Sequence, residues 1–202
     1  MIDVTSAYDR IAHWFDQNRT RSLIELPYLA CLSGALREGG SVLDLGCGTG
    51  EPILRYLVDQ RFEVLGVDSS AAMLEIAQAR FPQNRFALCD MRDLHLGRRF
   101  DAIVAWHSLF HLAPEAQRAM FPVFARHLQP GGLLMFTSGS EAGESWGENG
   151  GESLYHASLA TDEYRSLLAA QGFQVLRQAL DDPDCGGATV WIAQLGRSEQ
   201  AA

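Results

Sequence analysis

The stretch VLDLGCGTGEP, residues 42–52, decides the fold predicted for this chain. Its apolar first half is typical of a buried β-strand, and Gly46, Gly48 and Gly50 follow it directly. Glycine permits a tight turn and lets the backbone approach a ligand closely. Pro52 suits the first turn of a helix, whose N-terminus offers free N–H groups. The segment therefore predicts a strand, a glycine turn and a helix, with a ligand bound against the turn.

The spacing of the glycines helps to identify the class of ligand. A dinucleotide fingerprint has the pattern GxGxxG, with the pyrophosphate at the helix N-terminus. Counted from Gly46, the sixth position is Glu51, whose carboxylate would repel a pyrophosphate. Asp44 places a second acid just before the turn. An acidic rim of this kind favours a cationic ligand without phosphate.

Further along the chain, apolar runs alternate with helical patterns, as in an α/β fold with a mainly parallel sheet. Seven runs are strand-like: 41–46, 63–68, 85–90, 101–106, 133–137, 173–180 and 188–195. Between most of them lie residues with helical spacing, and a further helix is predicted before the first run. The last two runs are joined only by a turn-rich segment, 181–187, which predicts an antiparallel hairpin.

Composition and charge exclude several function classes. The chain has 202 residues, and its 16 basic residues are all arginine against 25 acidic ones, giving a net charge of −9. Such a balance disfavours nucleic acid and anionic membranes as partners, and the absence of lysine excludes Schiff-base chemistry and a P-loop. No apolar run approaches the roughly 20 residues of a membrane span. The four cysteines form no CxxC pair. We expect a cytoplasmic protein with one domain, 1–202, as a monomer or homodimer.

Two acidic residues end the next strand-like runs. Asp68, in VLGVDSS, lies 18 residues after Gly50 and could accept hydrogen bonds from both hydroxyls of a ribose or, alternatively, cap a helix. Asp90, in ALCDMRDL, could accept from an adenine amino group. Met73 and Met91 are soft apolar residues that could cover an adenine face or belong to the core.

The ordered set VLDLGCGTG, VLGVDSS, LCDMRDL, FDAIVAWHSLFHL and LQPGGLLMFT resembles the class I S-adenosylmethionine-dependent methyltransferases, over roughly residues 7–195. It is most similar to the small-molecule, quinone-biosynthesis-like group. The resemblance implies an α/β, Rossmann-like seven-stranded sheet with an antiparallel C-terminal hairpin and helices on both faces. It also implies S-adenosylmethionine as cofactor, S-adenosylhomocysteine as product and a small-molecule substrate. From the resemblance and from the motifs above, the residues expected to bind the cofactor are Tyr8, Arg19, Asp44, Gly46, Cys47, Gly48, Gly50, Asp68, Ser69, Met73, Asp90, Met91 and His107.

The resemblance further implies that the N-terminal residues 1–38 form a helical lid over the cofactor. Arg19 would then face the cofactor carboxylate or, alternatively, be solvated. Methyl transfer needs alignment and exclusion of water more than chemistry from the protein. His107 and His111 follow the fourth strand, at the expected mouth of the site, and are the catalytic candidates. His111 could act as a base or only pack against the next helix.

The segment 138–153 is rich in Gly, Glu and Ser and is predicted as a long loop. The resemblance implies that the loop region, 138–160, lies on the substrate side. Trp146, Tyr155 and His156 are the candidates for binding the substrate there, unless the loop only excludes water. No metal cluster is expected. Two other functions stay open: a nicotinamide-dependent oxidoreductase, and a cofactor-binding protein without catalysis.

Overall fold

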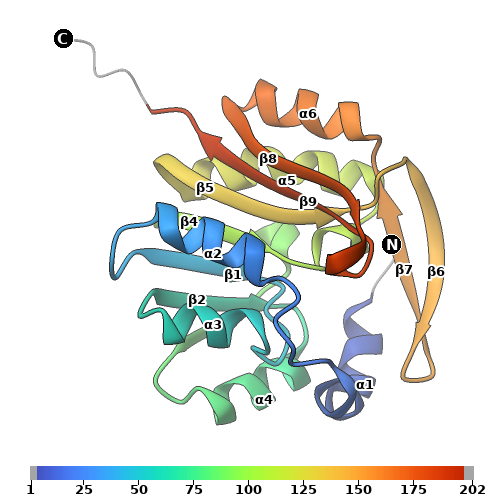
Figure 1. Cartoon of the computed structure of the whole chain (residues 1–202). Helices are drawn as coiled ribbons and strands as arrows, with labels where there is room; N and C mark the ends of the chain where they lie inside the picture. The colour runs from blue at the N-terminus through green and yellow to red at the C-terminus, as the bar shows by residue number, and fades with distance from the viewer. Residues whose placement is uncertain (1–3, 198–202) are drawn as a thin grey trace.

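A computed structural model describes residues 4–197 of the chain. Its centre is a seven-stranded sheet with strand order β3-β2-β1-β4-β5-β9-β8, and β6 and β7 form a separate two-stranded sheet (Figure 1). The strands are β1 Ser41–Leu45, β2 Glu63–Asp68, β3 Arg85–Leu88, β4 Phe100–Ala105, β5 Leu128–Ser138, β6 Gly143–Asn149, β7 Glu152–Ser158, β8 Phe173–Asp182 and β9 Ala188–Leu195.

The pairing of the strands confirms the predicted Rossmann-like fold. β1 pairs in parallel with β2 and β4, and the parallel part continues to β3 on one side and β5 on the other. β9 then runs antiparallel to β5, and β8 runs antiparallel to β9. The predicted C-terminal hairpin is therefore present, with its strands at the end of the sheet.

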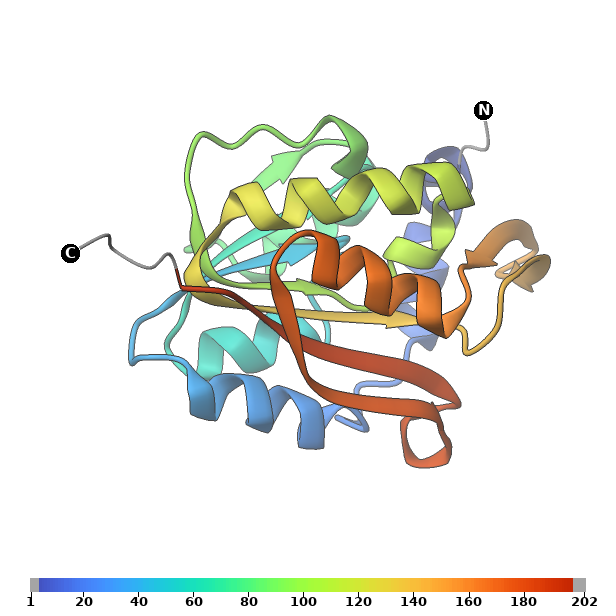
Figure 2. The same cartoon turned by 90° about the horizontal axis from the view of Figure 1, so that it is seen from above.

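Helices cover both faces of the sheet (Figure 2). They are α1 Thr5–Asn18, α2 Leu26–Ala35, α3 Ile53–Asp59, α4 Ala71–Arg80, α5 Pro114–His127 and α6 Thr161–Ala170. Successive residues of a strand point to opposite faces. Val42 accordingly packs with α2 and α3, whereas Leu43 packs with α5 and α6. Because β1 is buried on both faces, its apolar residues do not alternate with polar ones, as is usual in a parallel sheet.

One prediction about the fold is wrong: 138–160 is not a long loop. Residues 143–158 form the hairpin of β6 and β7, with seven residue pairs from Gly143↔Ser158 to Asn149↔Glu152. The two residues between the strands, Gly150 and Gly151, have φ values of 59° and 81°. A two-residue hairpin turn of this kind needs positive φ at both positions, which glycine supplies without strain. The high polarity of β6 concealed the strand, since six of its seven residues are exposed.

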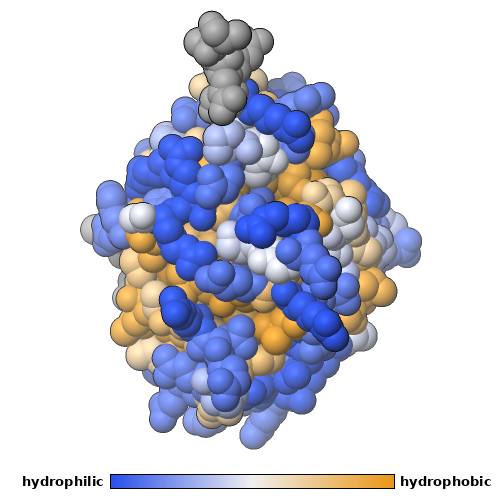
Figure 3. Space-filling view, turned by 90° about the vertical axis from the view of Figure 1, so that its left-hand side faces the viewer, coloured by the Kyte–Doolittle hydropathy of each residue, from blue (hydrophilic) through white to orange (hydrophobic). Residues whose placement is uncertain are grey.

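The hairpin and α1 lie at the same end of the sheet, beyond the carboxyl ends of the parallel strands (Figure 1). The opposite side of the molecule mixes hydrophilic and hydrophobic residues (Figure 3). Ion pairs near the amino ends of the strands include Arg37 with Asp101 and Arg98 with Glu63. Within residues 4–197, no helix is long and apolar enough to cross a membrane.

Candidate active site

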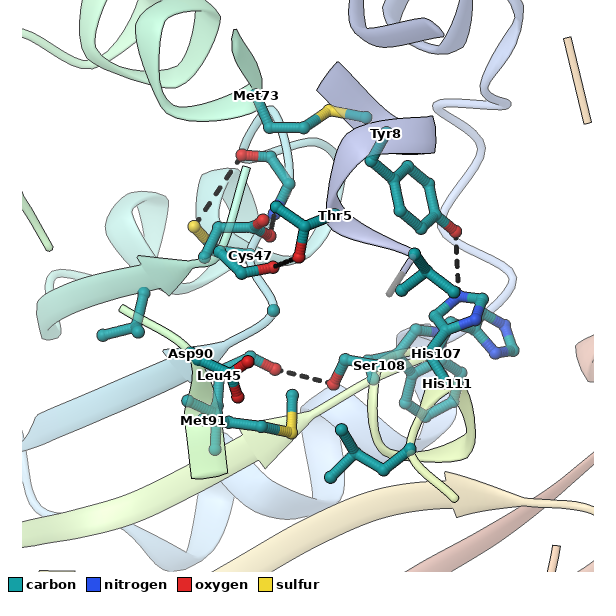
Figure 4. Close-up of a pocket in the computed structure, with 18 of the residues that line it drawn as sticks. Thr5, Tyr8, Leu45, Cys47, Met73, Asp90, Met91, His107, Ser108 and His111 are labelled. Atoms are coloured by element: carbon teal, nitrogen blue, oxygen red, sulfur yellow. Dashed lines mark hydrogen bonds between the residues drawn. The ribbon is translucent and has the colours of Figure 1, made fainter. Parts of the chain in front are cut away.

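A cavity of about 340 Å³ opens at the carboxyl ends of β1, β2 and β4. We call it the glycine-turn cavity, because the loop after β1 forms part of its wall. Most of the residues expected from the sequence meet here (Figure 4). Its lining includes Tyr8, Arg19, Asp44, Gly46, Cys47, Gly48, Asp68, Ser69, Met73, Asp90, Met91, His107 and His111.

The three glycines of the turn have positive φ values but different surroundings. A Cβ atom at Gly46 would lie 2.3 Å from Cβ of Ser108, and one at Gly50 would lie 2.6 Å from the ring of Phe81. Gly46 and Gly50 are therefore required by close packing, and Gly50 is not among the residues that line the cavity. At Gly48 a Cβ would meet only Phe15, at 4.0 Å. Gly48 is the position where the turn leaves open space, which a ligand could occupy.

Asp68 connects the turn to the next helix. One carboxylate oxygen, Oδ2, accepts from the backbone N–H of Gly48 at 2.8 Å, and Oδ1 accepts from that of Ser70 at 2.9 Å. Burial raises the pKa of Asp68, although these N–H groups act to lower it. The hydroxyl of Ser70 caps α4 by accepting from the N–H of Met73. Asp68 thus has a structural role that does not use all of its acceptor capacity.

Asp44 lies deeper, at the carboxyl end of β1. Its side chain is buried, and among the described residues no hydrogen-bond donor reaches its Oδ2. Burial, with a contribution from Asp68, raises the pKa of Asp44 to about 7, against the opposing influence of Arg19. A buried carboxylate without a partner is costly. A cation in the cavity would remove part of that cost.

The sequence predicts four acids around the site, namely Asp44 and Glu51 at the glycine turn and Asp68 and Asp90 at the ends of the next strands, and two of the four are paired within the protein. The Glu51 carboxylate accepts from Nε of Arg55 at 2.7 Å, so it does not stand free at the turn as the sequence argument required. Asp90 pairs with Arg92, which holds the pKa of that carboxyl below its usual value. Asp44 and Asp68 have no ion pair within the described residues.

Helix α1 covers the cavity and is tied to α4. Thr5 and Ser69 share a hydrogen bond between their hydroxyls, and the carboxylate of Asp9 accepts from the hydroxyl of Ser70. The helix also brings Tyr8 into the cavity, where burial and the nearby Asp68 raise its pKa to about 12. Arg19, at the end of α1, lines the cavity and donates from Nε to the Glu51 carbonyl. The sequence argument left Arg19 undecided, and the structure gives it this partner.

His111 joins α1 to the hairpin. Its Nδ1 lies 2.8 Å from the carbonyl oxygen of Tyr155, and its Nε2 lies 2.8 Å from the hydroxyl of Tyr8. A carbonyl oxygen only accepts, so Nδ1 carries the proton and Tyr8 donates to Nε2. Burial lowers the pKa of His111 to about 4. At neutral pH this ring is therefore an uncharged link between three segments.

His107 lies between two cavities. It lines the glycine-turn cavity and also a second cavity of about 520 Å³ beneath the hairpin, which we call the hairpin cavity. The backbone of His107 has a φ of 50°, uncommon for a residue other than glycine, and its N–H donates to Oγ1 of Thr137 at 2.9 Å. Burial lowers the pKa of His107 to about 4.

Of the three substrate-binding candidates on the hairpin, only His156 lines the hairpin cavity. Trp146 and Tyr155 are a cross-strand pair with their rings 5.3 Å apart. The adjacent pair, Ser145 and His156, points to the opposite face of the hairpin. Neither cavity is lined by Trp146 or Tyr155, and Tyr155 meets the other predicted site residues only through its backbone carbonyl, which is bonded to His111.

Phe110 and Thr5 also belong to the site, although neither residue is predicted from the sequence. Phe110 lines the hairpin cavity, and its ring lies 5.2 Å from that of His156 and 5.6 Å from that of His107. Phe110 lies between the two histidines of AWHSLFHL, and this position in the sequence could have indicated that it belongs to the site. Thr5 had no such signal, because its role depends on how α1 packs. In the described part of the chain, no three His, Cys, Asp or Glu side chains gather as a metal site would require.

Comparisons with known proteins agree with this architecture. Residues 42–132 match the family model described as a methyltransferase domain. The chain is 42% identical over 100 residues to dTDP-3-amino-3,6-dideoxy-alpha-D-glucopyranose N,N-dimethyltransferase of Streptomyces fradiae, a match that covers 48% of this chain and 39% of that protein. It is 35% identical over 122 residues to trans-aconitate 2-methyltransferase of Azoarcus sp. (strain BH72), covering 59% and 46%. The chain thus spans less than half the length of either relative.

The likeness to solved structures extends over nearly the whole chain. The CcbJ methyltransferase of Streptomyces caelestis superposes with a TM-score of 0.77 at 20% sequence identity, and the match covers 96% of this chain and 99% of that one. At this identity the likeness concerns the fold. With the matched residues 42–132, the sheet order and the glycine turn, the chain has the fold and the sequence motifs of a class I S-adenosylmethionine-dependent methyltransferase.

Proposed function

We propose that this chain transfers a methyl group from S-adenosylmethionine to a small-molecule acceptor. The observation that carries the proposal is the buried Asp44 carboxylate, which has an Oδ2 without a described donor in a cavity beside the glycine turn. A cationic ligand would supply the missing partner. The matches to methyltransferases support the same conclusion, and the acceptors named for the relatives, an amino sugar and trans-aconitate, leave its acceptor class open.

The residues of the glycine-turn cavity fit the parts of this cofactor. Asp44 and Arg19 both line the cavity and carry opposite charges. They match the ammonium and the carboxylate of the amino-acid part of the cofactor. Asp68 can still accept hydrogen bonds from ribose hydroxyls. In this assignment Asp90 lies at the edge of the adenine and Met91 lies against its face, and both residues line the cavity. The volume of about 340 Å³ is within the ~300–1,000 Å³ range of small-molecule sites.

When bound, S-adenosylmethionine supplies a methyl group that is already activated on a sulfonium. The tasks of this chain are then to orient the two reactants and to exclude water. Helix α1 covers the cavity, and the Tyr8–His111 hydrogen bond holds it against the segment after β4. His107, which lines both cavities, is in position to touch both reactants.

The hairpin cavity is the acceptor site in this proposal. Its walls come from the ends of β5 and β9, from the hairpin and from the segment after β4. We retain the organisation expected from the sequence: one methyltransferase domain, 1–202, with an N-terminal lid, 1–38, and a substrate-side segment, 138–160. The first three residues of that lid lie outside the described residues.

Calorimetry with S-adenosylmethionine and S-adenosylhomocysteine tests the proposal directly. No binding at millimolar ligand by folded protein would reject it. Protection from thermal unfolding by NAD(P), with none by S-adenosylmethionine, would favour the nicotinamide-dependent oxidoreductase instead. A third possibility is cofactor binding without catalysis. Methyl-labelled cofactor mixed with a cell extract addresses it, since label appearing in a small molecule requires transfer.

Asp68→Ala should weaken binding by about 2–4 kcal/mol, because the charge-assisted hydrogen bonds to the ribose hydroxyls are lost. The same change removes acceptors from the N–H groups of Gly48 and Ser70, so circular dichroism and thermal unfolding must first show that the variant folds. An unchanged affinity in the folded variant would exclude the ribose role of Asp68.

A further inference from the structure

The hairpin cavity has an unbalanced charge. Two acidic residues, Glu141 and Glu144, line it, and no arginine among residues 4–197 does. The chain contains no lysine that could supply a positive charge instead. The Glu144 carboxylate accepts from the hydroxyl of Tyr155 at 2.6 Å, whereas the described contacts give the Glu141 carboxylate no ion pair or hydrogen bond. An anionic acceptor would find no counter-charge here, and it would face at least one carboxylate.

The inner end of the same cavity is lined by rings. His107, Phe110 and His156 all contribute to its wall, and His111 packs behind them with its ring 4.8 Å from Phe110 and 4.9 Å from His156. Ring faces attract cations, and clusters of aromatic rings are used to bind alkylated ammonium groups. The rings also meet at the junction with the glycine-turn cavity, where the reacting atom of an acceptor must arrive.

From these observations we infer that the acceptor is a small molecule carrying an amine, which binds in the hairpin cavity with its nitrogen among the rings of His107, Phe110 and His156. This inference rests on the proposed function and narrows it. Carboxylates are excluded by the charge of the cavity, and alcohols by the chemistry described next.

The histidines of the site are poor bases. Burial lowers the pKa of His107 to about 4, and it also lowers the pKa of His156. A hydroxyl acceptor calls for a base with a pKa near the working pH. An alkylammonium that binds among the rings must first lose one proton, which goes to water, and the neutral amine then carries the lone pair that attacks. Unlike a hydroxyl, it therefore needs no base of the protein with a pKa near the working pH.

The reaction then balances without a further reactant. The amine lone pair forms the N–C bond to the methyl carbon, and the C–S bond breaks with its electron pair remaining on sulfur. The new ammonium, R–NH2⁺–CH3, loses a proton to water. The uncharged rings accommodate the methylated ammonium product as well as the amine.

Three probes of matched size test the inference on the full chain: cyclohexylamine, cyclohexanol and cyclohexanecarboxylate. Each is titrated into protein saturated with S-adenosylhomocysteine, and each is supplied with labelled S-adenosylmethionine. We expect the amine to bind at least tenfold more tightly than the other two and to be the only probe methylated. The absence of a preference for the amine, or methylation of the alcohol or carboxylate, overturns the inference. Failure of S-adenosylhomocysteine to bind would instead reject the proposed function.

A charge reversal supplies a second test. Glu141→Arg places a cation at the cavity wall, so it should abolish the preference for the amine and improve carboxylate binding at least tenfold. Glu148→Arg is the matched control, because it makes the same change on β6 at a residue that does not line the cavity. Both variants should bind S-adenosylhomocysteine as the original chain does. If the two substitutions had equal effects, only the overall charge of the chain would matter. The assignment of the acceptor to the hairpin cavity would then be rejected.

Discussion

The glycine turn and the β6–β7 hairpin are both glycine-rich, but their glycines have different roles. In the turn, a Cβ at Gly46 or Gly50 would collide with Ser108 or Phe81, so neighbouring core residues fix the backbone. In the hairpin, no described residue beyond the chain neighbours lies within 4 Å of such an atom at Gly143 or Gly151, and Gly150 is closely packed against Trp14 of α1. The turn is built into the core of the sheet, whereas the hairpin has an exposed strand, β6, and a largely buried one, β7, which pair only with each other among the described residues.

The hairpin is positioned instead by contacts with other elements. Arg10 of α1 forms a two-pronged ion pair with Glu152, at 2.7 and 2.6 Å. Trp14 packs on Gly150, where a Cβ would lie 2.7 Å from the indole. His111 accounts for a third contact through the Tyr155 carbonyl. The cofactor side of the site therefore depends on backbone packing, and the acceptor side on a few side-chain contacts.

Gly46→Ala should produce the largest effect. The added Cβ would clash with Ser108, and the φ of 82° is unfavourable for alanine, so we expect a loss of about 2–5 kcal/mol in the free energy of unfolding. Binding of S-adenosylhomocysteine should become undetectable by calorimetry. Thermal unfolding measures the first effect.

Gly34→Ala is the control for this substitution, since Gly34 lies in α2 and has nothing within 4 Å of an added Cβ. It should unfold at or above the temperature of the original chain. If both glycines tolerated alanine equally, the contrast between a packed turn and open positions would fail.

Asp44→Asn should have the next largest effect on cofactor binding. The pH dependence of the affinity identifies the contribution of this carboxylate. With a pKa of about 7, Asp44 must lose a proton to pair with a cation, so affinity for S-adenosylhomocysteine should rise about tenfold from pH 6 to pH 8. Calorimetry at pH 6 in two buffers of different ionisation enthalpy should detect the released proton. The Asn variant should bind about 10–100-fold more weakly at pH 8, from the loss of a charged hydrogen bond.

The same variant should be more stable without ligand. The folded-state pKa of Asp44 is raised above the unfolded value of 3.8, so this carboxyl destabilises the folded chain, fully above pH 7 and not at all below pH 3.8. Asp44→Asn should therefore raise the unfolding temperature at pH 8 but not at pH 4. Because Asp68 and Arg19 also act on Asp44, the difference between variant and original chain is the relevant quantity. Loss of stability at pH 8 would contradict this account.

Tyr8→Phe should have the smallest effect, since it removes one neutral hydrogen bond to His111 of about 1 kcal/mol. Helix α1 keeps its bonds to α4 and its ion pair to the hairpin. We expect severalfold faster release of S-adenosylhomocysteine, with faster hydrogen exchange confined to α1 and the hairpin. Faster exchange throughout the central sheet would show instead that Tyr8 supports the whole fold.

The cofactor side could be predicted from the sequence because its determinants are contiguous. A buried strand followed by Gly46 and Gly48 predicts a turn at the sheet edge, and the acids that end β1 and β2 follow from the same pattern. Parallel strands bring their carboxyl ends together, so Asp44, Asp68 and His107 meet without further information.

The acceptor side could not be predicted in the same way. The strand β6 has no apolar alternation, and only the Gly150–Gly151 pair marked the turn. The face of the hairpin that meets the cavity depends on the register of β6 and β7, which composition does not encode. Trp146 is therefore predicted at the substrate site, whereas in the structure it lies on the other face of the hairpin from His156. The ion pairs of Glu51 and Asp90 depend on arginine side-chain conformations, which the sequence pattern also leaves open.

The isolation of the hairpin has a consequence for protein engineering. Because β6 and β7 pair only with each other, the segment can be exchanged as a unit between short connections to β5 and α6. Such a graft would leave the packed turn around Gly46 intact. Retargeting this scaffold to new acceptors is therefore a problem of designing one short ribbon and its contacts with α1, α5 and the segment after β4, with the rest of the chain kept constant.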